Sequence, residues 1–280
     1  MYIFFYSTKG FFNLTSIFEE IRPLRISLLL AQEMEPQRTL VLDLGNTRTK
    51  WALFENESLE EAGSFSNSSP LNQKELNNLK SFQAEILIYS SVLGKDYPGL
   101  NNFQSISKNV REFTTATAVG IASNYKTPAT LGADRWANAA AARSMFDDRN
   151  VCVFDIGTCL KHDVVTADGV YLGGSISPGV SMRFKALTNQ TNQLPLTNPA
   201  KDWPSSGNDT ESSIRAGVME GLLLEIKGRI TSIKQQFKQP IFVLTGGDAH
   251  YFADKLKNST FAVPNLTLIG IHTAVKYHGK

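Results

Sequence analysis

The sequence contains little cysteine, little net charge and no long apolar run. Its 280 residues include two cysteines, Cys152 and Cys159, which excludes a disulfide framework and predicts a reduced, cytoplasmic location. No stretch approaches the about 18 consecutive apolar residues of a membrane-spanning helix, so we expect no contact with the membrane. The net charge is +2 and the basic residues are scattered, so a nucleic-acid footprint is not expected.

The composition is that of a globular protein. Hydrophobic residues make up 42% and charged residues 19% of the sequence, and 280 residues suffice for one large domain or two ordinary ones. From residue 39 onward, segments with strand patterns alternate with segments with helix patterns. This alternation predicts an α/β protein.

Residues 39–54 predict a β-hairpin whose tip could bind phosphate. Residues 40–42 and 51–54 are apolar strand segments, and Gly45 and Asn46 between them form a turn pair that tolerates positive φ. The tip is polar, and its backbone N–H groups could face a phosphate chain. Asp43 ends the first strand, where a carboxylate could hold a water on phosphate-bound Mg²⁺. The same residues also fit an ordinary hairpin with a solvated turn.

The pattern occurs a second time in residues 151–174. An apolar strand again runs into Asp155, Gly157 and Thr158, and a further hairpin follows. A third apolar strand, residues 241–244, runs into Gly246 and Gly247, where the lack of side chains would let a flat adenine or ribose approach the backbone. Two halves that open on the same hairpin predict a duplicated domain with nucleotide between the halves.

Residues 135–146 form a strong helix by propensity, and Asp134 stands where an N-cap would lie. These residues alone leave two interpretations open for Asp134, helix capping or a carboxylate that faces a cleft. Arg135 could be solvated in the first turn or could bind a carboxylate-bearing substrate through two nitrogens. Thr210 could likewise cap the next helix, expected over residues 212–237, or contact substrate. His162 stands alone beside a strand and is expected to be structural.

The remaining elements follow from local pattern and turn residues. We expect strands at 62–65, 84–92 and 261–263, and helices capped at 68–70 and ending near Lys80, at 180–187, at 248–257 and at 270–277. Residues 94–102 and the proline-containing stretch 188–210 are expected to be loops.

Taken together, these motifs resemble the acetate kinase, sugar kinase, Hsp70 and actin superfamily. Within it the chain is similar to type III pantothenate kinases from about residue 38 to residue 275, and residues Tyr125 to Arg135 (Tyr-Lys-Thr-Pro-Ala-Thr-Leu-Gly-Ala-Asp-Arg) are the most specific part. The resemblance implies duplicated ribonuclease H-like domains, as in actin-like ATPases, with the nucleotide site between them. It also implies ATP-dependent phosphorylation of pantothenate to 4'-phosphopantothenate, the first step of coenzyme A biosynthesis.

The resemblance assigns roles to individual residues. Asp134 would be the catalytic base. ATP would be bound by Asp43, Leu44, Gly45, Asn46, Thr47, Arg48, Thr49, Lys50 and Thr158. Pantothenate would be bound by Tyr125, Gly132, Ala133, Asp134, Arg135 and Thr210. The implied cofactors are Mg²⁺ and a monovalent cation, K⁺ or NH4⁺, with Asp155 as its ligand.

The chain departs from the family at Cys159, Leu160 and Lys161, where small or hydroxylic residues are usual. The roles of Cys159, Lys161 and His162 are therefore left open. The resemblance also implies a homodimer to which the helix expected over residues 212–237 contributes.

We expect three segments along the chain. Residues 1–37 would be an N-terminal extension, with Met34 as the true first residue, and residues 38–147 and 148–280 would be the two actin-like halves.

Two other functions fit the same fold. One is phosphorylation of a different small molecule, against which the block from Tyr125 to Arg135 argues. The other is a nucleotide-binding regulator that has lost catalysis. The presence of Asp43, Asp134, Asp155 and Thr158 argues against the second.

Overall fold

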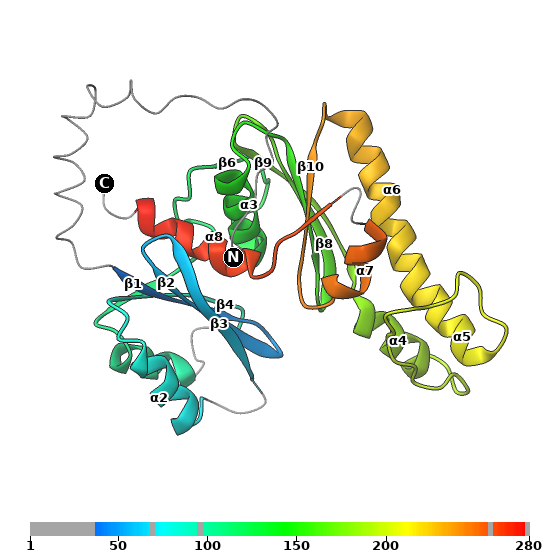
Figure 1. Cartoon of the computed structure of the whole chain (residues 1–280), viewed down its shortest axis with the longest axis horizontal. Coiled ribbons are helices and arrows are strands. Elements are labelled where there is room, and N and C mark those ends of the chain that lie inside the picture. Colours follow the sequence, from blue (N-terminus) through cyan, green and yellow to red (C-terminus); the bar gives the residue numbers. More distant parts are fainter. Residues whose placement is uncertain (1–36, 68–70, 94–97, 257–259, 278–280) are drawn as a thin grey trace, which may run out of the picture. The chain divides into compact units, whose positions relative to one another are not determined.

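The computed structural model describes residues 37–67, 71–93, 98–256 and 260–277 (Figure 1). The expectations for residues 1–36, including Met34 as the first residue, lie outside these ranges. Residues 38–280 form one compact unit. Within its described part, no helix combines the length and the apolarity needed to cross a membrane.

The first sheet surrounds the strand that carries Asp43. Its strand order is β3-β2-β1-β4-β5. The strands are β1 (Arg38–Leu44), β2 (Arg48–Glu55), β3 (Ser58–Ser66), β4 (Ile86–Ser91) and β5 (Asn109–Glu112). The central strand β1 is antiparallel to β2 and parallel to β4. Leu40, Val41 and Leu42 in β1 are fully buried, because both faces of this strand are covered.

The second sheet repeats the arrangement around the strand that carries Asp155. Its order is β11-β10-β7-β8-β9-β6. The strands are β6 (Ala122–Ser123), β7 (Val151–Ile156), β8 (Cys159–Val165), β9 (Val170–Pro178), β10 (Ile241–Thr245) and β11 (Phe261–Ala262). As in the first sheet, the central strand β7 is antiparallel to the next strand, β8, and parallel to β10. The sheets therefore share one topology, which confirms the duplication predicted from the repeated hairpin.

The two hairpins also share their register. Asp43 of β1 lies opposite Lys50 of β2, and Asp155 of β7 lies opposite Lys161 of β8. Each half thus places one aspartate and one lysine side by side at the carboxyl end of its central strand.

Two helices join the sheets through a common apolar core. They are α3 (Ala133–Met145) and α8 (Leu266–Thr273), which is followed by a 3-10 turn over Ala274–Tyr277. Gly270 lies where the helices cross, and a Cβ atom there would come within 1.8 Å of the carbonyl oxygen of Ala137. The sequence placed the start of the last helix at Gly270. It begins earlier because Asn265, with a φ of 59°, turns the chain into the helix just before Leu266.

Helices cover the second sheet with a separate core (Figure 1). They are α4 (Val180–Asn189), α5 (Thr210–Arg215), α6 (Gly221–Gln236) and α7 (Ala249–Leu256). The single helix expected over 212–237 is instead interrupted by a π-helical turn at Ala216–Glu220. Apolar residues recur at helical spacing across this turn, so periodicity did not reveal it.

Two expectations for the first sheet are wrong in detail. The helix α2 (Gln73–Ser81) begins after Asn72, whose side chain accepts the backbone N–H of Glu75, and not at residues 68–70. The Glu75 carboxylate accepts the backbone N–H of Asn72 in return, so a complete capping box fixes this start. The described part of the loop expected over 94–102 belongs to a 3-10 helix, Pro98–Ser105.

We expect His272 to make stability depend on pH. His272 is 7% exposed and stacks on Phe54 with ring centroids 4.0 Å apart. Burial, assisted by the charge of Lys276, lowers the pKa of His272 from 6.5 to about 4. Between these values the unfolded chain binds the proton and the folded chain does not. Stability from this group is therefore complete above pH 6.5 and is lost as the pH falls toward 4.

The measurement is urea unfolding of the wild type and of His272→Phe at pH 7 and pH 5. We expect the wild type to lose about 2 kcal/mol more than the variant between these values. The comparison must be between the two proteins, because burial raises the pKa of Asp43 to about 6 and so acts in the opposite direction over much of the same range. Equal pH dependence in both proteins would contradict the assignment.

Candidate active site

The tip of the β1–β2 hairpin is held by a residue outside it. Asn67, just after β3, donates its amide to the carbonyl of Gly45 at 2.6 Å and accepts the hydroxyl of Thr49 at 2.8 Å. The backbone N–H of Asn67 also donates to the carbonyl of Thr47 at 3.0 Å. The sequence analysis missed Asn67, since nothing in the local pattern shows that it folds back onto the turn.

The side chains of the expected phosphate-binding residues differ in their exposure to solvent and in their hydrogen bonds. Thr49 is 2% exposed, so its hydroxyl faces Asn67 and not the solvent. The guanidinium of Arg48 donates to Ser64 at 2.7 Å. Asn46 and Thr47 are exposed at the tip. The backbone of the tip, together with these two residues, is the part of the hairpin that remains available to a ligand.

Three aspartates from different elements converge near the two hairpins. Asp43 ends β1, Asp155 lies near the end of β7, and Asp134 lies in the first turn of α3. Burial raises the pKa of Asp43 to about 6; the positive charge of Lys50 opposes this shift, while the charges of Asp134 and Asp155 add to it. Asp43 is therefore the member of this set whose ionised form a nearby cation would stabilise.

Lys161 connects two of these aspartates. Its ammonium nitrogen lies 2.5 Å from Oδ2 of Asp134 and 2.7 Å from Oδ2 of Asp155. The three side chains are 16%, 28% and 13% exposed, in the order Lys161, Asp134, Asp155. The sequence left the role of Lys161 open. The alternation along β8 could have placed it opposite Asp155, but its contact with Asp134 depends on how α3 packs.

Asp134 is not the N-cap of its helix. Gly132 occupies that position. A Cβ atom at this residue would lie 2.5 Å from Oδ1 of Asp134, so the absence of a side chain makes room for the carboxylate. Oδ1 accepts the backbone N–H of Arg135 at 2.8 Å, and Oδ2 contacts Lys161. Burial alone would raise the pKa of Asp134, but Lys161 and this N–H outweigh it and lower the pKa. The carboxylate is therefore ionised at neutral pH.

Arg135 is buried and already paired, which rules out the solvated position that was one of its two interpretations. It is 4% exposed and donates from Nη2 to Asp163 at 2.6 Å and from Nε to both Asp163 oxygens at 3.1 Å. The Tyr171 hydroxyl donates to the same carboxylate at 2.6 Å. Nη1 of Arg135 lies 3.4 Å from the hydroxyl of Tyr125. Asp163 and Tyr125 thus hold the guanidinium of Arg135 in place.

The β7–β8 hairpin and the loop that follows β10 meet at Asp155. Thr158 is exposed at the β7–β8 turn, where the N–H of Gly157 bonds the carbonyl of Cys159 at 3.0 Å. Gly246 has a φ of 98°, and a Cβ there would lie 2.6 Å from Oδ1 of Asp155. Asn138 of α3 adds a contact to Asp155 at 3.4 Å. The loop after β10 thus lies directly against the second hairpin.

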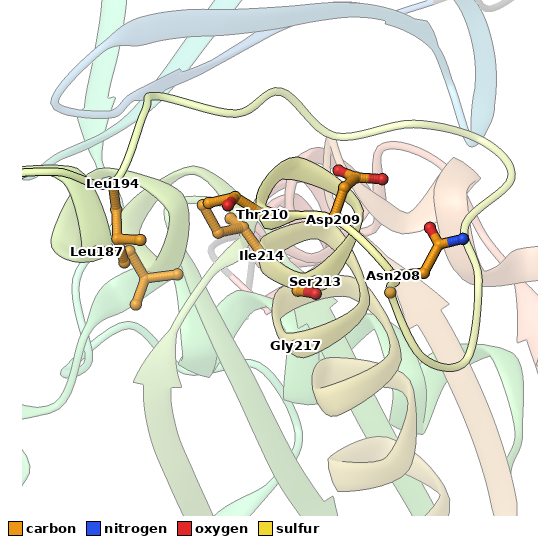
Figure 2. Close-up of a pocket in the computed structure, with 9 residues that line it drawn as sticks. Leu187, Leu194, Asn208, Asp209, Thr210, Ser213, Ile214 and Gly217 are labelled. Atoms are coloured by element: carbon orange, nitrogen blue, oxygen red, sulfur yellow. The ribbon is translucent and has the colours of Figure 1, made fainter.

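Thr210 lies apart from the other expected substrate residues. Asp209, and not Thr210, caps α5, through a bond from the N–H of Ser212 at 2.9 Å. Thr210 is exposed and lines a pocket of about 760 Å³ beside α4 and α5 (Figure 2). The pocket is formed by Leu187, Leu194, Gly207, Asn208, Asp209, Thr210, Ser213, Ile214 and Gly217. In Figure 1, α5 lies well away from α3, whose first turn carries Asp134.

The fold and the cluster define a class of protein. Two sheets of one topology, with acidic hairpin ends that face each other, are duplicated ribonuclease H-like domains, the fold of actin-like ATPases and sugar kinases. Among solved structures, component A of the (R)-2-hydroxyglutaryl-CoA dehydratase from Acidaminococcus fermentans is similar in fold. The TM-score is 0.50 at 14% identity, over 86% of this chain and 97% of that one.

Sequence comparison narrows this class to one family. The sequence model described as Type III pantothenate kinase matches residues 39–232. The type III pantothenate kinase of Christiangramia forsetii is 39% identical over 85% of this chain and 98% of its own length. That of Phocaeicola vulgatus is 36% identical over 86% and 99%. The chain belongs to the type III pantothenate kinase family.

Proposed function

We propose that this chain transfers the γ-phosphoryl group of ATP to the primary hydroxyl of pantothenate and so begins coenzyme A biosynthesis. The observation that carries the proposal is that Lys161 holds Asp134 beside Asp155, at the ends of the two hairpins that would bind phosphate. An alcohol keeps its proton at neutral pH, so attack on phosphorus requires an acceptor, and Asp134 is that acceptor. Membership of the family supports pantothenate over other small-molecule hydroxyls.

The nucleotide would lie between the halves formed by residues 38–147 and 148–280. We propose that the exposed tip of the first hairpin, between Leu44 and Lys50, holds the phosphates from one side and that Thr158 holds them from the other. Mg²⁺, where bound, would neutralise charge on the phosphate oxygens, with Asp43 in reach of its water shell. Lys50 lies opposite Asp43 and adds positive charge on the same side.

Pantothenate would lie against the start of α3. Tyr125, the Nη1 of Arg135 that donates to its hydroxyl, and the backbone at Gly132 and Ala133 form the face around Asp134 that would meet it. The buried pair of Arg135 with Asp163 holds this face in place. Thr210 does not join this face within one chain, so its role in binding pantothenate would require a second copy.

The test of the activity is ADP release by the purified protein with ATP and Mg²⁺, with and without pantothenate. We expect release to depend on pantothenate and not on acetate or sugars. Stimulation by another hydroxyl in place of pantothenate would support the rival kinase function. Tight ATP binding without turnover on any acceptor would support a silent regulator, which nothing in the site favours.

We also propose that the chain forms a homodimer through β9, α4 and α6. Beyond Tyr171, the edge of β9 that faces away from β8 has no strand beside it among the described residues, because β6 pairs only with Val170 and Tyr171. Arg183 and Ser177 both bond Glu225, which brings the three elements together. Large apolar side chains are exposed on these elements, namely Leu172, Ile176, Met182 and Leu224. Such a grouping is typical of an association surface.

The prediction for this surface concerns Leu224, which is 57% exposed on α6. The wild type should have twice the chain mass of 30.9 kDa by light scattering, and Leu224→Glu should shift the mass toward one chain, because a charge would be buried in the interface. Phe261→Glu is the control, since Phe261 is equally exposed, at 59%, on the strand β11 at the opposite edge of the sheet. A wild type that remains a monomer at micromolar concentration would contradict the proposal.

For cofactors, ATP and a divalent cation follow from the family, and the site fits both. The K⁺ or NH4⁺ expected beside Asp155 does not fit, because the ammonium of Lys161 already lies 2.7 Å from that carboxylate. A cytoplasmic location remains part of the proposal. It is supported by Cys152 and Cys159, both of which carry free thiols.

A further inference from the structure

Lys161 lies where two carboxylates would otherwise share a cation. Its nitrogen is 2.5 Å from Oδ2 of Asp134 and 2.7 Å from Oδ2 of Asp155, so both oxygens contact one ammonium group. Two aspartates this close repel one another unless a positive charge lies between them. In this chain a covalently attached charge fills that place.

The position of Lys161 is built into the fold. The β7–β8 register sets Lys161 opposite Asp155, and the antiparallel pairing continues on both sides of this pair. Burial would lower the pKa of Lys161, but Asp155 and Asp134 outweigh it and raise the pKa well above its usual range. The ammonium group is therefore permanently charged.

We propose that the ammonium of Lys161 replaces a monovalent cation between Asp155 and Asp134, so that this chain works without added K⁺ or NH4⁺. The proposal rests on the proposed kinase function for its activity readout. A lysine ammonium offers carboxylate oxygens the same kind of N–H donor as NH4⁺, and because it is covalently attached no ion has to be captured from solution. A positive charge would therefore lie between the two carboxylates whichever salt is present.

The first experiment compares pantothenate-dependent ADP release in sodium, potassium and ammonium salts at one ionic strength, which keeps general screening constant. We expect the wild type to show equal rates in all three. Lys161→Ala should be slower in sodium by about 10²-fold, the usual effect of removing one preorganised charge from an active site. Potassium or ammonium should restore much of that loss. Lys74→Met, an exposed lysine on α2, should behave as the wild type does.

The second experiment needs no catalysis. A cation that binds the folded variant raises its thermal midpoint by mass action. Potassium should therefore raise the midpoint of Lys161→Ala but not that of the wild type, and Asp155→Asn added to Lys161→Ala should abolish the rise.

Two results would overturn the proposal. One is a wild type whose rate depends on potassium. The other is a folded Lys161→Ala variant whose rate and midpoint are both indifferent to potassium, since Lys161 would then be a structural ion-pair partner only. If pantothenate stimulates no turnover in any salt, the kinase function fails, while the thermal midpoints still decide whether Lys161 replaces a cation.

Discussion

Asp134→Asn should lower kcat for pantothenate phosphorylation by about 10² to 10⁴, the usual range for loss of a general base. Asparagine keeps the shape of the side chain and can still accept the N–H of Arg135, but its amide oxygen does not take up the proton of the attacking hydroxyl. The binding of ATP should change little, because the proposed nucleotide contacts come from the hairpins and not from α3. The measurement is kcat together with the Kd for ATP.

The matched control is Asp148→Asn, just beyond the end of the same helix. The Asp148 side chain is 89% exposed, and its φ of 57° is one that asparagine adopts as readily as aspartate. We expect no change in kcat for this variant. If Asp134→Asn retained the wild-type kcat, another group would have to be the proton acceptor.

Asp163→Asn should destabilise the fold by about 3 to 5 kcal/mol, the usual cost of leaving one partner of a buried ion pair unmatched. The side chains of Arg135 and Asp163 are 5% and 3% exposed, so water cannot replace the lost charge. The amide would still contact Tyr171 and one nitrogen of Arg135, but the guanidinium would stay buried without a counter-charge. Urea unfolding followed by circular dichroism measures the loss.

The control for this pair is the surface pair of Arg38 and Glu55. These side chains are 45% and 33% exposed and 3.7 Å apart, so Glu55→Gln should cost no more than about 1 kcal/mol. The loss of stability for Tyr171→Phe should lie between those for Glu55→Gln and Asp163→Asn. This variant removes one buried hydrogen bond to Asp163 and leaves the charges paired. A loss below 1 kcal/mol for Asp163→Asn would show that the buried pair is not essential to the fold.

The two predictions are linked, because Asp134 is next in the chain to Arg135, the partner of Asp163. Asp134 and Arg135 are adjacent in α3, yet one faces Lys161 near the hairpins and the other is buried against Asp163. The backbone N–H of Arg135 also contacts Asp134, so a loss of the buried pair would disturb the proposed base. We therefore expect Asp163→Asn to lower kcat by displacing Asp134. This effect should be smaller than that of Asp134→Asn when both variants are measured at a temperature at which they are folded.

Much of the fold follows from local pattern. Strands of the two hairpins are short apolar runs that end on aspartate and a turn, and α3 is rich in alanine. These features depend on a few consecutive residues, so the sequence alone indicates the duplication, the helix that carries Asp134 and the family. Helix starts were less certain, since capping at Asn72 and Asp209 depends on which of several polar residues first reaches a free N–H.

The contacts that give the site its chemistry join residues far apart in the chain. Lys161 meets Asp134 across 27 positions, Arg135 meets Asp163 across 28, and Asn67 meets Gly45 across 22. No local periodicity specifies such pairs, because they depend on how α3 and the two sheets pack. The sequence by itself determined which acids and hairpins are present. Only the tertiary structure decided that Arg135 is buried, that Thr210 lies apart and that Lys161 stands between two aspartates.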